Sequence, residues 1–304
     1  MAFRKIGIMS IGEMGYHWAQ LLNLHGAEVL TYDRDRSEVT RKRAENVDVK
    51  STGSLQQLCQ ESDLIVSIVV PSAALKIAAK IAKSATQVNR RDLLYLDANA
   101  ISPMTAEKIN TVLGQCGVSF VDGCIIGSAA KMDKGAVVYA SGPQASRILE
   151  LESFGFTVQV LGAGTSQASA FKVVYAGLTK GLQGLFVELL MGAKSFGLLD
   201  EIVNRYEESF PGLLDKVSPS IIGLRVHAAR RAEEMDELKR TYAHHGMRSL
   251  LAPAIQKVLG SIAELDVRTT SEKGIREGNL LDVLELFYQK GLLKDERLAP
   301  KTSK

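Results

Sequence analysis

Near its amino terminus the chain reads Ile6-Gly7-Ile8-Met9-Ser10-Ile11-Gly12-Glu13-Met14-Gly15, and this segment decides the fold. The run 5–9 predicts a strand, and a helical pattern follows the small residues of the loop. A second apolar run, residues 28–32, ends at Asp33, eighteen residues beyond Gly15. The segment therefore predicts a strand, a tight turn, a helix and a second strand.

The glycine spacing in this loop is similar to the Gly-x-Gly-x-x-Gly loop that holds a dinucleotide pyrophosphate. Gly12 stands where the backbone approaches the pyrophosphate, Gly15 where the helix packs on the strand, and Ser10 where a tight-turn glycine is usual. The free N–H groups and positive dipole end of the helix favour an anion. We therefore predict that these loop residues bind the cofactor: Ser10, Ile11, Gly12, Glu13, Met14 and Gly15.

Residues after the second predicted strand give opposite indications about the cofactor. Asp33 can accept hydrogen bonds from ribose hydroxyls and repel a 2′-phosphate, which favours NAD. Arg34, Arg36 and Ser37 can bind that phosphate, which favours NADP, or can be surface residues. We assign Asp33 and Arg34 to the site for NAD or NADP, with a slight preference for NAD.

Composition restricts the class of protein. With 304 residues, of which 46% are hydrophobic and 23% charged, the chain is typical of globular proteins and long enough for two cores. A net charge of +3 is too small to indicate a nucleic-acid-binding surface. Cys59, Cys116 and Cys124 are widely spaced, which favours free thiols in a reducing compartment. We expect no signal peptide or membrane span, and hence a cytoplasmic protein that binds a small-molecule substrate.

From residue 6 to about 162, short β-branched runs alternate with helical patterns, as in a parallel sheet covered by helices. The predicted strands are residues 5–9, 28–32, 64–69, 93–96, 119–121, 136–140 and 157–160. The run 64–70 is apolar on both faces and indicates a strand near the sheet centre. Val70 and Pro71, at its end, are added to the predicted cofactor site. Residues 1–163 are thus predicted to form an α/β domain of the Rossmann type, with a doubly wound parallel sheet.

Strand patterns stop after Gly162, and the second domain, residues 164–304, is predicted to be all helical. An unusually long helix begins after Thr165 or Ser166, ends near Gly197 and carries an apolar stripe. Its glycines at positions 177, 181 and 184 favour a helix crossing, and close approach of a ligand is the alternative. Residues from about 294 are predicted to form a loose tail.

Four segments in order are similar to motifs of the β-hydroxyacid dehydrogenases, the family of 3-hydroxyisobutyrate dehydrogenase and of the cofactor domain of 6-phosphogluconate dehydrogenase. They are the glycine loop, Asp97-Ala-Asn-Ala-Ile-Ser-Pro103, Phe120-Val-Asp-Gly-Cys-Ile-Ile-Gly-Ser128 and Gly162-Ala-Gly-Thr-Ser-Gln-Ala-Ser-Ala-Phe-Lys172. The resemblance is clearest from residue 6 to about 197. It implies NAD or NADP as cofactor, a hydroxy or oxo compound as substrate, and a homodimer to which the long helix contributes.

The resemblance implies three catalytic candidates. In the family, a lysine matching Lys172 is the general acid/base, a role that partial burial favours by lowering the amine pKa. Asn99 falls where the 6-phosphogluconate enzymes have an asparagine that holds substrate and nicotinamide; a strand-end turn residue is the alternative. Ala176 replaces the family asparagine one turn after the lysine. Tyr175 can donate a hydrogen bond in its place, or can belong to the apolar stripe.

The substrate candidates depart further from the family pattern. Ile126-Gly127-Ser128 replaces its Ser-Gly-Gly loop and lacks a hydroxyl that seats a carboxylate, so we expect a bulkier or less acidic substrate. Arg231 is our candidate for an anion anchor, in a segment whose charge pairs also suit an exposed helix. His244 and His245 have no third ligand at metal-binding spacing, and no metal site is predicted.

These motifs favour an oxidoreductase that moves hydride between the nicotinamide and a hydroxy or oxo compound, with Lys172 passing the proton. An imine reductase is the nearest enzymatic alternative, because those enzymes share the architecture and tolerate changed polar groups near the nicotinamide. A non-catalytic dinucleotide-binding protein is the other alternative, since Ser10, Ala176 and Ile126 depart from the family pattern.

Overall fold

The structure, a computed structural model, describes residues 3–34, 36–265, 267 and 278–294. The chain divides into two compact units, Met1–Lys172 and Val173–Lys304. The boundary expected at residues 163/164 lies just before helix α6 (Gln167–Ser195), whereas the first unit also includes the opening turns of this helix. The expected tail, apart from Lys294, lies outside the described residues.

The first unit is built on an eight-stranded sheet with the order β3-β2-β1-β4-β5-β6-β7-β8. The strands are β1 (Lys5–Met9), β2 (Glu28–Thr31), β3 (Lys50–Ser51), β4 (Leu64–Ser67), β5 (Leu94–Asp97), β6 (Ser119–Ile126), β7 (Val137–Ser141) and β8 (Thr157–Gly162). The parallel arrangement of most strands, with helices between them, is the predicted Rossmann-type α/β fold. β4 lies near the sheet centre, as its apolar run predicts.

Two features of the sheet differ from the prediction. β7 is antiparallel to β6, because only ten residues, 127–136, connect them, and a parallel crossover needs a dozen or more. β3 has only two residues, both exposed, so no apolar pattern indicates it. Its pairing with β2 nevertheless places Ser51 beside the residues that follow β2.

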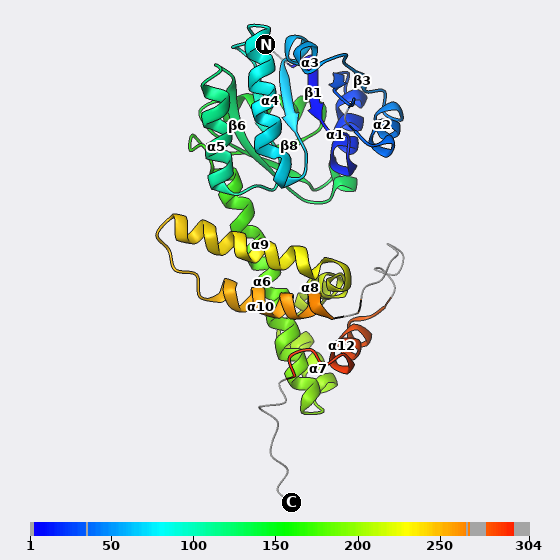
Figure 1. Cartoon of the computed structure of the whole chain (residues 1–304). Helices are drawn as coiled ribbons and strands as arrows, with labels where there is room; N and C mark the ends of the chain where they lie inside the picture. The colour runs from blue at the N-terminus through cyan, green and yellow to red at the C-terminus, as the bar shows by residue number, and fades with distance from the viewer. Residues whose placement is uncertain (1–2, 35, 266, 268–277, 295–304) are drawn as a thin grey trace, which may run out of the picture. The chain divides into compact units, whose positions relative to one another are not determined.

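Helices and two hydrophobic clusters cover the two faces of the sheet (Figure 1). Along β4, Leu64 and Val66 belong to one cluster and Ile65 to the other, as the alternation of strand side chains requires. The helical segments of this unit are α1 (Glu13–Leu24), α2 (Glu38–Glu45), α3 (Leu55–Glu61), η1 (Pro71–Ala73), α4 (Ala74–Gln87), α5 (Pro103–Gly114), η2 (Ala129–Lys131) and η3 (Ala145–Phe154).

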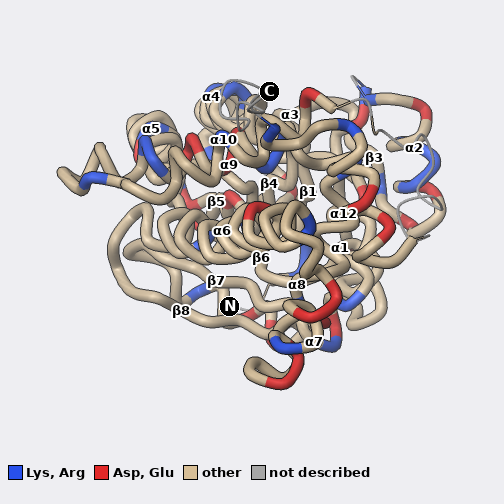
Figure 2. The backbone as a smooth tube through the Cα atoms, turned by 90° about the horizontal axis from the view of Figure 1, so that it is seen from below, with Lys and Arg blue, Asp and Glu red and all other residues tan. Residues whose placement is uncertain are grey.

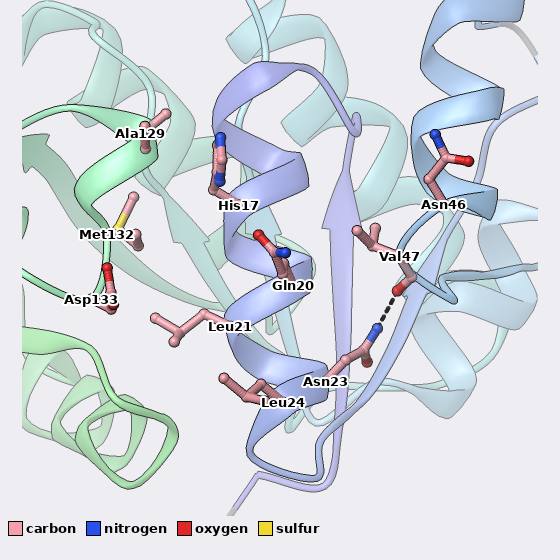
Figure 3. A pocket seen from close by; sticks show the side chains of 11 residues that line it. His17, Gln20, Leu21, Asn23, Leu24, Asn46, Val47, Ala129, Met132 and Asp133 are labelled. Carbon is pink, nitrogen blue, oxygen red and sulfur yellow. Dashed lines mark hydrogen bonds between the residues drawn. The ribbon is translucent and has the colours of Figure 1, made fainter.

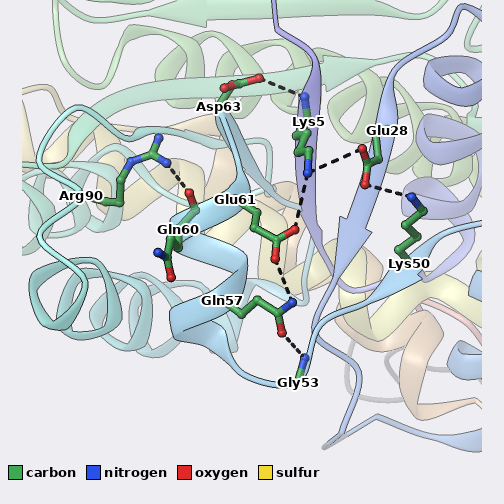
Figure 4. Close-up of polar contacts among 9 residues, drawn as sticks. All are labelled: Lys5, Glu28, Lys50, Gly53, Gln57, Gln60, Glu61, Asp63 and Arg90. Carbon is green, nitrogen blue, oxygen red and sulfur yellow. Dashed lines mark hydrogen bonds and ion pairs between the residues drawn. The ribbon is translucent and has the colours of Figure 1, made fainter.

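Ion pairs join the amino ends of the first strands (Figure 4). The Lys5 ammonium lies 3.7 Å from a carboxylate oxygen of Glu28 and 3.6 Å from one of Glu61, while Lys50 lies 3.0 Å from Glu28. The Asp63 carboxylate accepts from the backbone N–H of Lys5 at 2.9 Å. Because Lys5 and Glu28 open β1 and β2, this network lies at the edge of the sheet opposite to the glycine loop.

The second unit is helical, as predicted. Besides most of α6 it contains α7 (Leu199–Ser209), α8 (Leu213–Ile222), α9 (Leu224–His244), α10 (Leu251–Glu264) and α12 (Leu280–Gln289). A Cβ atom on Gly177 would lie 2.6 Å from Leu238 of α9, and one on Gly184 would lie 2.8 Å from Ile255 of α10. The helix-crossing interpretation is therefore confirmed at these two positions, whereas Gly181 has open space beside it.

Helix α6 keeps much of its apolar stripe exposed. By length and composition alone it is apolar enough to cross a membrane, with a mean hydropathy of 1.2. Leu178, Leu185 and Leu189 are all exposed in the structure. Its lysine at position 180, by contrast, lies 2.6 Å from the Glu234 carboxylate of α9. Charges of both signs alternate along the described chain (Figure 2). An exposed apolar stripe of this kind is typical of an interaction surface.

Candidate dinucleotide and catalytic site

The loop after β1 has the geometry that the fingerprint predicts. Ser10 has a φ of 85°, the left-handed conformation that a glycine at this position would adopt. Gly12 is the N-cap of α1 and supplies no capping side chain, and a Cβ atom there would meet nothing within 4 Å. A Cβ atom on Gly15 would instead lie 2.3 Å from the Ser10 carbonyl oxygen. Gly12 thus leaves room for a ligand, whereas Gly15 is required by the packing of α1 on the loop.

The other loop residues differ in what they can offer. The Ile11 side chain is buried in the core, and Met14 packs against the same cluster. Glu13 is exposed, and its negative charge in the first turn of α1 would repel a pyrophosphate. These three residues can therefore hold an anion through backbone N–H groups but not through their side chains.

The residues after β2 lie at the same carboxyl edge of the sheet. Asp33 is half-buried, and its carboxylate accepts a hydrogen bond from the Ser51 hydroxyl of β3. Arg34 is exposed. The Ser37 hydroxyl caps α2 by accepting from the Thr40 N–H at 3.3 Å. Since Ser37 has this structural role, Asp33 and Arg34 are the better placed of the predicted cofactor residues.

Asn99 connects the carboxyl ends of β4 and β5. Its Oδ1 accepts from the Val69 N–H at 2.6 Å, and its Nδ2 donates to the Ser67 hydroxyl at 3.0 Å and to the Asp97 carboxylate at 2.9 Å. The side chain is 3% exposed. Both amide hydrogens are therefore used within the protein, and Asn99 fixes the segment that leads to Val70 and Pro71, both of which are exposed.

Two buried carboxyl groups stand opposite each other on neighbouring strands. Asp97 ends β5 and pairs in register with Asp122 of β6. Burial, and secondarily the charge of Asp122, raise the pKa of Asp97 to about 7, although hydrogen bonds from Asn99 oppose this. Burial also raises the pKa of Asp122 to about 6, against the effect of hydrogen bonds from Ser169 and Ser141.

The start of α6 brings Lys172 to the carboxyl half of β6. The Lys172 ammonium donates a 2.6 Å hydrogen bond to the Ile125 carbonyl oxygen. The buried thiol of Cys124 is close by, and burial raises its pKa to about 12. A half-buried lysine is thus held beside the first residues of the predicted substrate loop.

In that loop, the backbone conformation and the packing at position 127 require a glycine. Its φ is 136°, and a Cβ atom there would lie 2.6 Å from the Ala136 Cα. Ile126 is half-buried, while Ser128 is exposed and precedes η2. The turn that reverses β6 into β7 therefore requires this glycine, whether or not a substrate approaches it.

The two remaining candidates belong to the helical unit. Tyr175 follows Lys172 by three residues on α6 and is exposed. The Arg231 guanidinium donates to the Gln183 side chain at 3.0 Å and to the Ser220 carbonyl at 2.6 Å. Burial lowers the pKa of Arg231 to about 10. Its neighbours Arg230 and Arg240 form the i,i+4 ion pairs expected of an exposed helix.

A pocket of about 550 Å³ lies beside α1 and contains none of the predicted site residues (Figure 3). The polar side chains that line it are His17, Gln20, Asn23, Asn46 and Asp133. His17 and Gln20 lie beyond the first turn of α1, whereas Asn46 follows α2 and Asp133 follows η2.

Comparison with known proteins agrees with this geometry. Residues 5–154 match the NAD binding domain of 6-phosphogluconate dehydrogenase, and residues 193–262 match a domain of unknown function (DUF1932). An uncharacterized 28.5 kDa protein of Methanothermus fervidus is 29% identical over 86% of this chain and 99% of its own length. A conserved protein whose structure is similar to 3-hydroxyacid dehydrogenases is 26% identical, with a TM-score of 0.73 over 86% of this chain and 97% of that one.

The chain is a distant homologue of the 3-hydroxyacid dehydrogenases. The 3-hydroxyisobutyrate dehydrogenase of Mycobacterium tuberculosis, solved with L-serine, shares the fold at 15% identity, with a TM-score of 0.73 over 94% of this chain and 99% of that one. The family resemblance predicted from four motifs is confirmed, and a nicotinamide dinucleotide is the cofactor class of the family.

In this 3-hydroxyacid dehydrogenase homologue, sequence patterns did not identify the polar groups beneath the site. These groups are Ser67, Asp97, Asp122, Ser141 and Ser169, each buried in the structure. A signal was present, since Asp97 and Asp122 are charged residues in strongly apolar runs, inside two of the quoted motifs. Among the described residues, no group of three or more His, Cys, Asp or Glu side chains could hold a metal ion.

Proposed function

We propose that the chain is an NAD(P)-dependent oxidoreductase that transfers hydride between the nicotinamide and a hydroxy or oxo compound, with Lys172 as general acid/base. The observation that carries the proposal is the 2.6 Å hydrogen bond from the Lys172 ammonium to the Ile125 carbonyl. Ile125 lies near the carboxyl end of β6, and the glycine loop follows the carboxyl end of the parallel strand β1. Ligands of doubly wound sheets bind at this edge.

The residues present fit a dinucleotide. The open space at Gly12 and the N-terminus of α1 suit a pyrophosphate, and Asp33 suits the adenosine ribose. A bound nicotinamide supplies or accepts the hydride. Asn99 holds the segment before Val70 and Pro71, which gives the cofactor site a fixed wall. Asp33 favours NAD slightly over NADP.

Lys172 handles the proton. The Lys172 ammonium donates to the Ile125 carbonyl. In reduction, an N–H of this ammonium donates to the substrate oxygen and its proton is transferred as negative charge develops there; in oxidation, the neutral amine removes the hydroxyl proton. We propose Tyr175 as a second donor to that oxygen and Arg231 as an anion anchor. With Ile126 in place of a serine, the substrate is less acidic or bulkier than a small hydroxy acid.

The proposed assembly is a cytoplasmic homodimer. A groove of about 680 Å³ between α6, α9 and α10 is lined mainly by apolar side chains. The exposed residues Leu178 and Leu185 of α6 line it, together with Leu250 and Leu251 at the start of α10. A second copy offers a matching apolar face, as an isologous interface requires. Two of the three cysteines are buried free thiols, which suits a reducing compartment.

Replacement of Lys172 by methionine tests the mechanism. Lys172→Met removes the amine and keeps most of the apolar stem, so we expect turnover to be lost while cofactor binding stays within about threefold. Lys108→Met, at an exposed lysine of α5, is the matched control. Wild-type turnover in Lys172→Met would refute the acid/base assignment.

The substrate assay separates the alternatives. Hydroxy acids, alcohols, ketones and cyclic imines are offered with both cofactors. Turnover of imines alone would favour an imine reductase. Tight cofactor binding without turnover of any substrate class would favour the non-catalytic dinucleotide-binding protein.

A further inference from the structure

The first turn of α6 is capped from the sheet. The Asp122 carboxylate accepts from the Ser169 backbone N–H at 2.8 Å and from the Ser169 hydroxyl at 2.6 Å. Ser141 of β7 donates to the same carboxylate at 3.3 Å and accepts from the Ala168 N–H at 2.9 Å. Two N–H groups that a helix start leaves without intrahelical partners are therefore bound by strands β6 and β7.

This cap is dry and charged. Asp122 and Ser141 are fully buried, and Ser169 is 1% exposed. Hydrogen bonds to an ionised carboxylate are stronger than those between neutral groups, and a dry site excludes the water that would compete for them. The backbone of Ser169 is consequently fixed relative to β6.

Lys172 follows Ser169 by three residues, about one turn along the helix, and Ile125 follows Asp122 by three residues along the strand. The two contacts, Ser169 with Asp122 and Lys172 with Ile125, thus join one helical turn to one strand segment. A lysine side chain has four rotatable bonds, so the location of its amine is defined only when its Cα is also fixed. The Asp122 carboxylate binds the first turn of α6 through Ser169 and so fixes the Cα of Lys172 relative to β6.

We propose that Asp122 is a positioning residue that holds the Lys172 amine at the reacting centre, acting through Ser169 and the first turn of α6. The inference rests on the proposed role of Lys172. Asp122 acts through Ser169 and not through contact with substrate or cofactor.

Two substitutions at Asp122 separate geometry from charge. In Asp122→Asn, the amide oxygen still accepts from the Ser169 N–H, and the amide nitrogen donates to the Ser169 hydroxyl, which reverses its role. Asp122→Ala leaves the buried N–H without an acceptor. Ser169→Ala removes only one donor and keeps the backbone bond. Ser166→Ala is the matched control, because its hydroxyl bonds Glu107 at the same helix start and not Asp122.

The first measurement does not depend on turnover. A small amine-reactive reagent labels the protein, and peptide mass spectrometry compares the rate at Lys172 with that at the exposed Lys108. We expect labelling of Lys172 to be about fivefold faster in Asp122→Ala, within about twofold of wild type in Asp122→Asn and Ser166→Ala, and about twofold to threefold faster in Ser169→Ala. Wild-type labelling of Lys172 in a folded Asp122→Ala, or in Ser169→Ala if the first variant does not fold, overturns the proposal.

The second measurement is the split between kcat and the KM for the cofactor. In Asp122→Ala we expect kcat to fall about 10- to 100-fold, because a misplaced group costs rate more than binding, with the cofactor KM within about threefold. Asp122→Asn should restore kcat to within about threefold. A kcat loss in Asp122→Asn equal to that in Asp122→Ala also overturns the proposal. Wild-type turnover in Lys172→Met instead refutes the acid/base role of Lys172, while the labelling rates still report on the position of its amine.

Discussion

A Cβ atom on Gly15 would lie 2.3 Å from the carbonyl oxygen of Ser10, whereas one on Gly12 would meet nothing. The two glycines of one fingerprint therefore serve different purposes. In Gly15→Ala, helix α1 must move away from the loop, and we expect the free energy of unfolding to fall by about 1–3 kcal/mol. Gly12→Ala should change stability by less than about 0.5 kcal/mol, yet weaken cofactor binding about tenfold or more, because its methyl group occupies the space of the pyrophosphate.

Denaturant unfolding and fluorescence titration with NADH measure the two effects on the same protein samples. If Gly12→Ala bound NADH like the wild type, the pyrophosphate would have to lie elsewhere. Equal stability of Gly15→Ala and the wild type would contradict the proposed packing role of Gly15.

Ser10 provides a stabilising prediction. Its φ of 85° costs an L-residue roughly 1–2 kcal/mol, and a glycine avoids this cost but loses about 0.5–1 kcal/mol of backbone entropy. We expect Ser10→Gly to raise the free energy of unfolding by about 0.5–1 kcal/mol without weakening NADH binding. Equilibrium urea unfolding checks this, and a destabilised Ser10→Gly would show that the serine hydroxyl has a structural role.

Much of the fold could be predicted from the sequence. The apolar runs that became β1, β4 and β5 are continuous and end in turn residues, and period and length identify such strands without a partner. β3 could not be predicted, because its two exposed residues show no alternation of apolar and polar side chains. The direction of β7 is decided by the short link from β6, a constraint of length rather than of local pattern.

Only part of the candidate site could be predicted from the sequence. The fingerprint spacing predicted the backbone geometry at Ser10, Gly12 and Gly15, while cofactor binding by these residues stays a prediction. Asn99 was assigned to substrate and cofactor, yet its side chain is bonded to the nearby Asp97 and to Ser67 and Val69, which lie about thirty residues earlier, at and just beyond the end of β4. Buried polar networks depend on such long-range contacts, so the sequence shows Asp97 and Asp122 as charged residues in apolar runs but does not give their partners.

Asp97 predicts a pH dependence of stability. Burial raises its pKa in the folded chain to about 7, above its value of about 4 in an unfolded chain. Between these values the folded state binds more protons than the unfolded state, so the free energy of unfolding falls as the pH rises from about 4 to about 7, by at most about 4 kcal/mol from this group. Asp122 contributes in the same direction.

The variant Asp97→Asn removes one titrating group and should flatten that slope. The amide also leaves one Asn99 donor without an acceptor, which lowers stability at every pH but does not alter the slope. Urea unfolding at a series of pH values measures both effects, with the exposed Asp92→Asn as control. An undiminished slope in Asp97→Asn would assign the pH dependence to other groups.

Asp33 predicts the cofactor preference. Its carboxylate is oriented by the Ser51 hydroxyl, and it would repel a 2′-phosphate at the position where Arg34 could attract one. We expect Asp33→Ser to bind NADPH about tenfold more tightly, roughly 1.4 kcal/mol, and NADH more weakly. Ser51→Ala should shift the preference in the same direction by a smaller factor. Fluorescence titrations with NADH and NADPH measure these affinities. Unchanged affinities in Asp33→Ser would place the adenosine ribose away from this carboxylate.

The exposed stripe on α6 predicts a dimer that one charge disrupts. Leu178 is 65% exposed and Leu251 is 78% exposed, beside a groove that continues between α9 and α10. A carboxylate at either position would be buried without a partner in an apolar interface, so Leu178→Asp and Leu251→Asp should sediment as monomers at micromolar concentration. Leu24→Asp, on α1 and 77% exposed, should leave the mass unchanged. A monomeric wild type would contradict the dimer, and binding of that monomer to lipid vesicles, abolished by Leu178→Asp, would identify a membrane surface as the partner of the stripe.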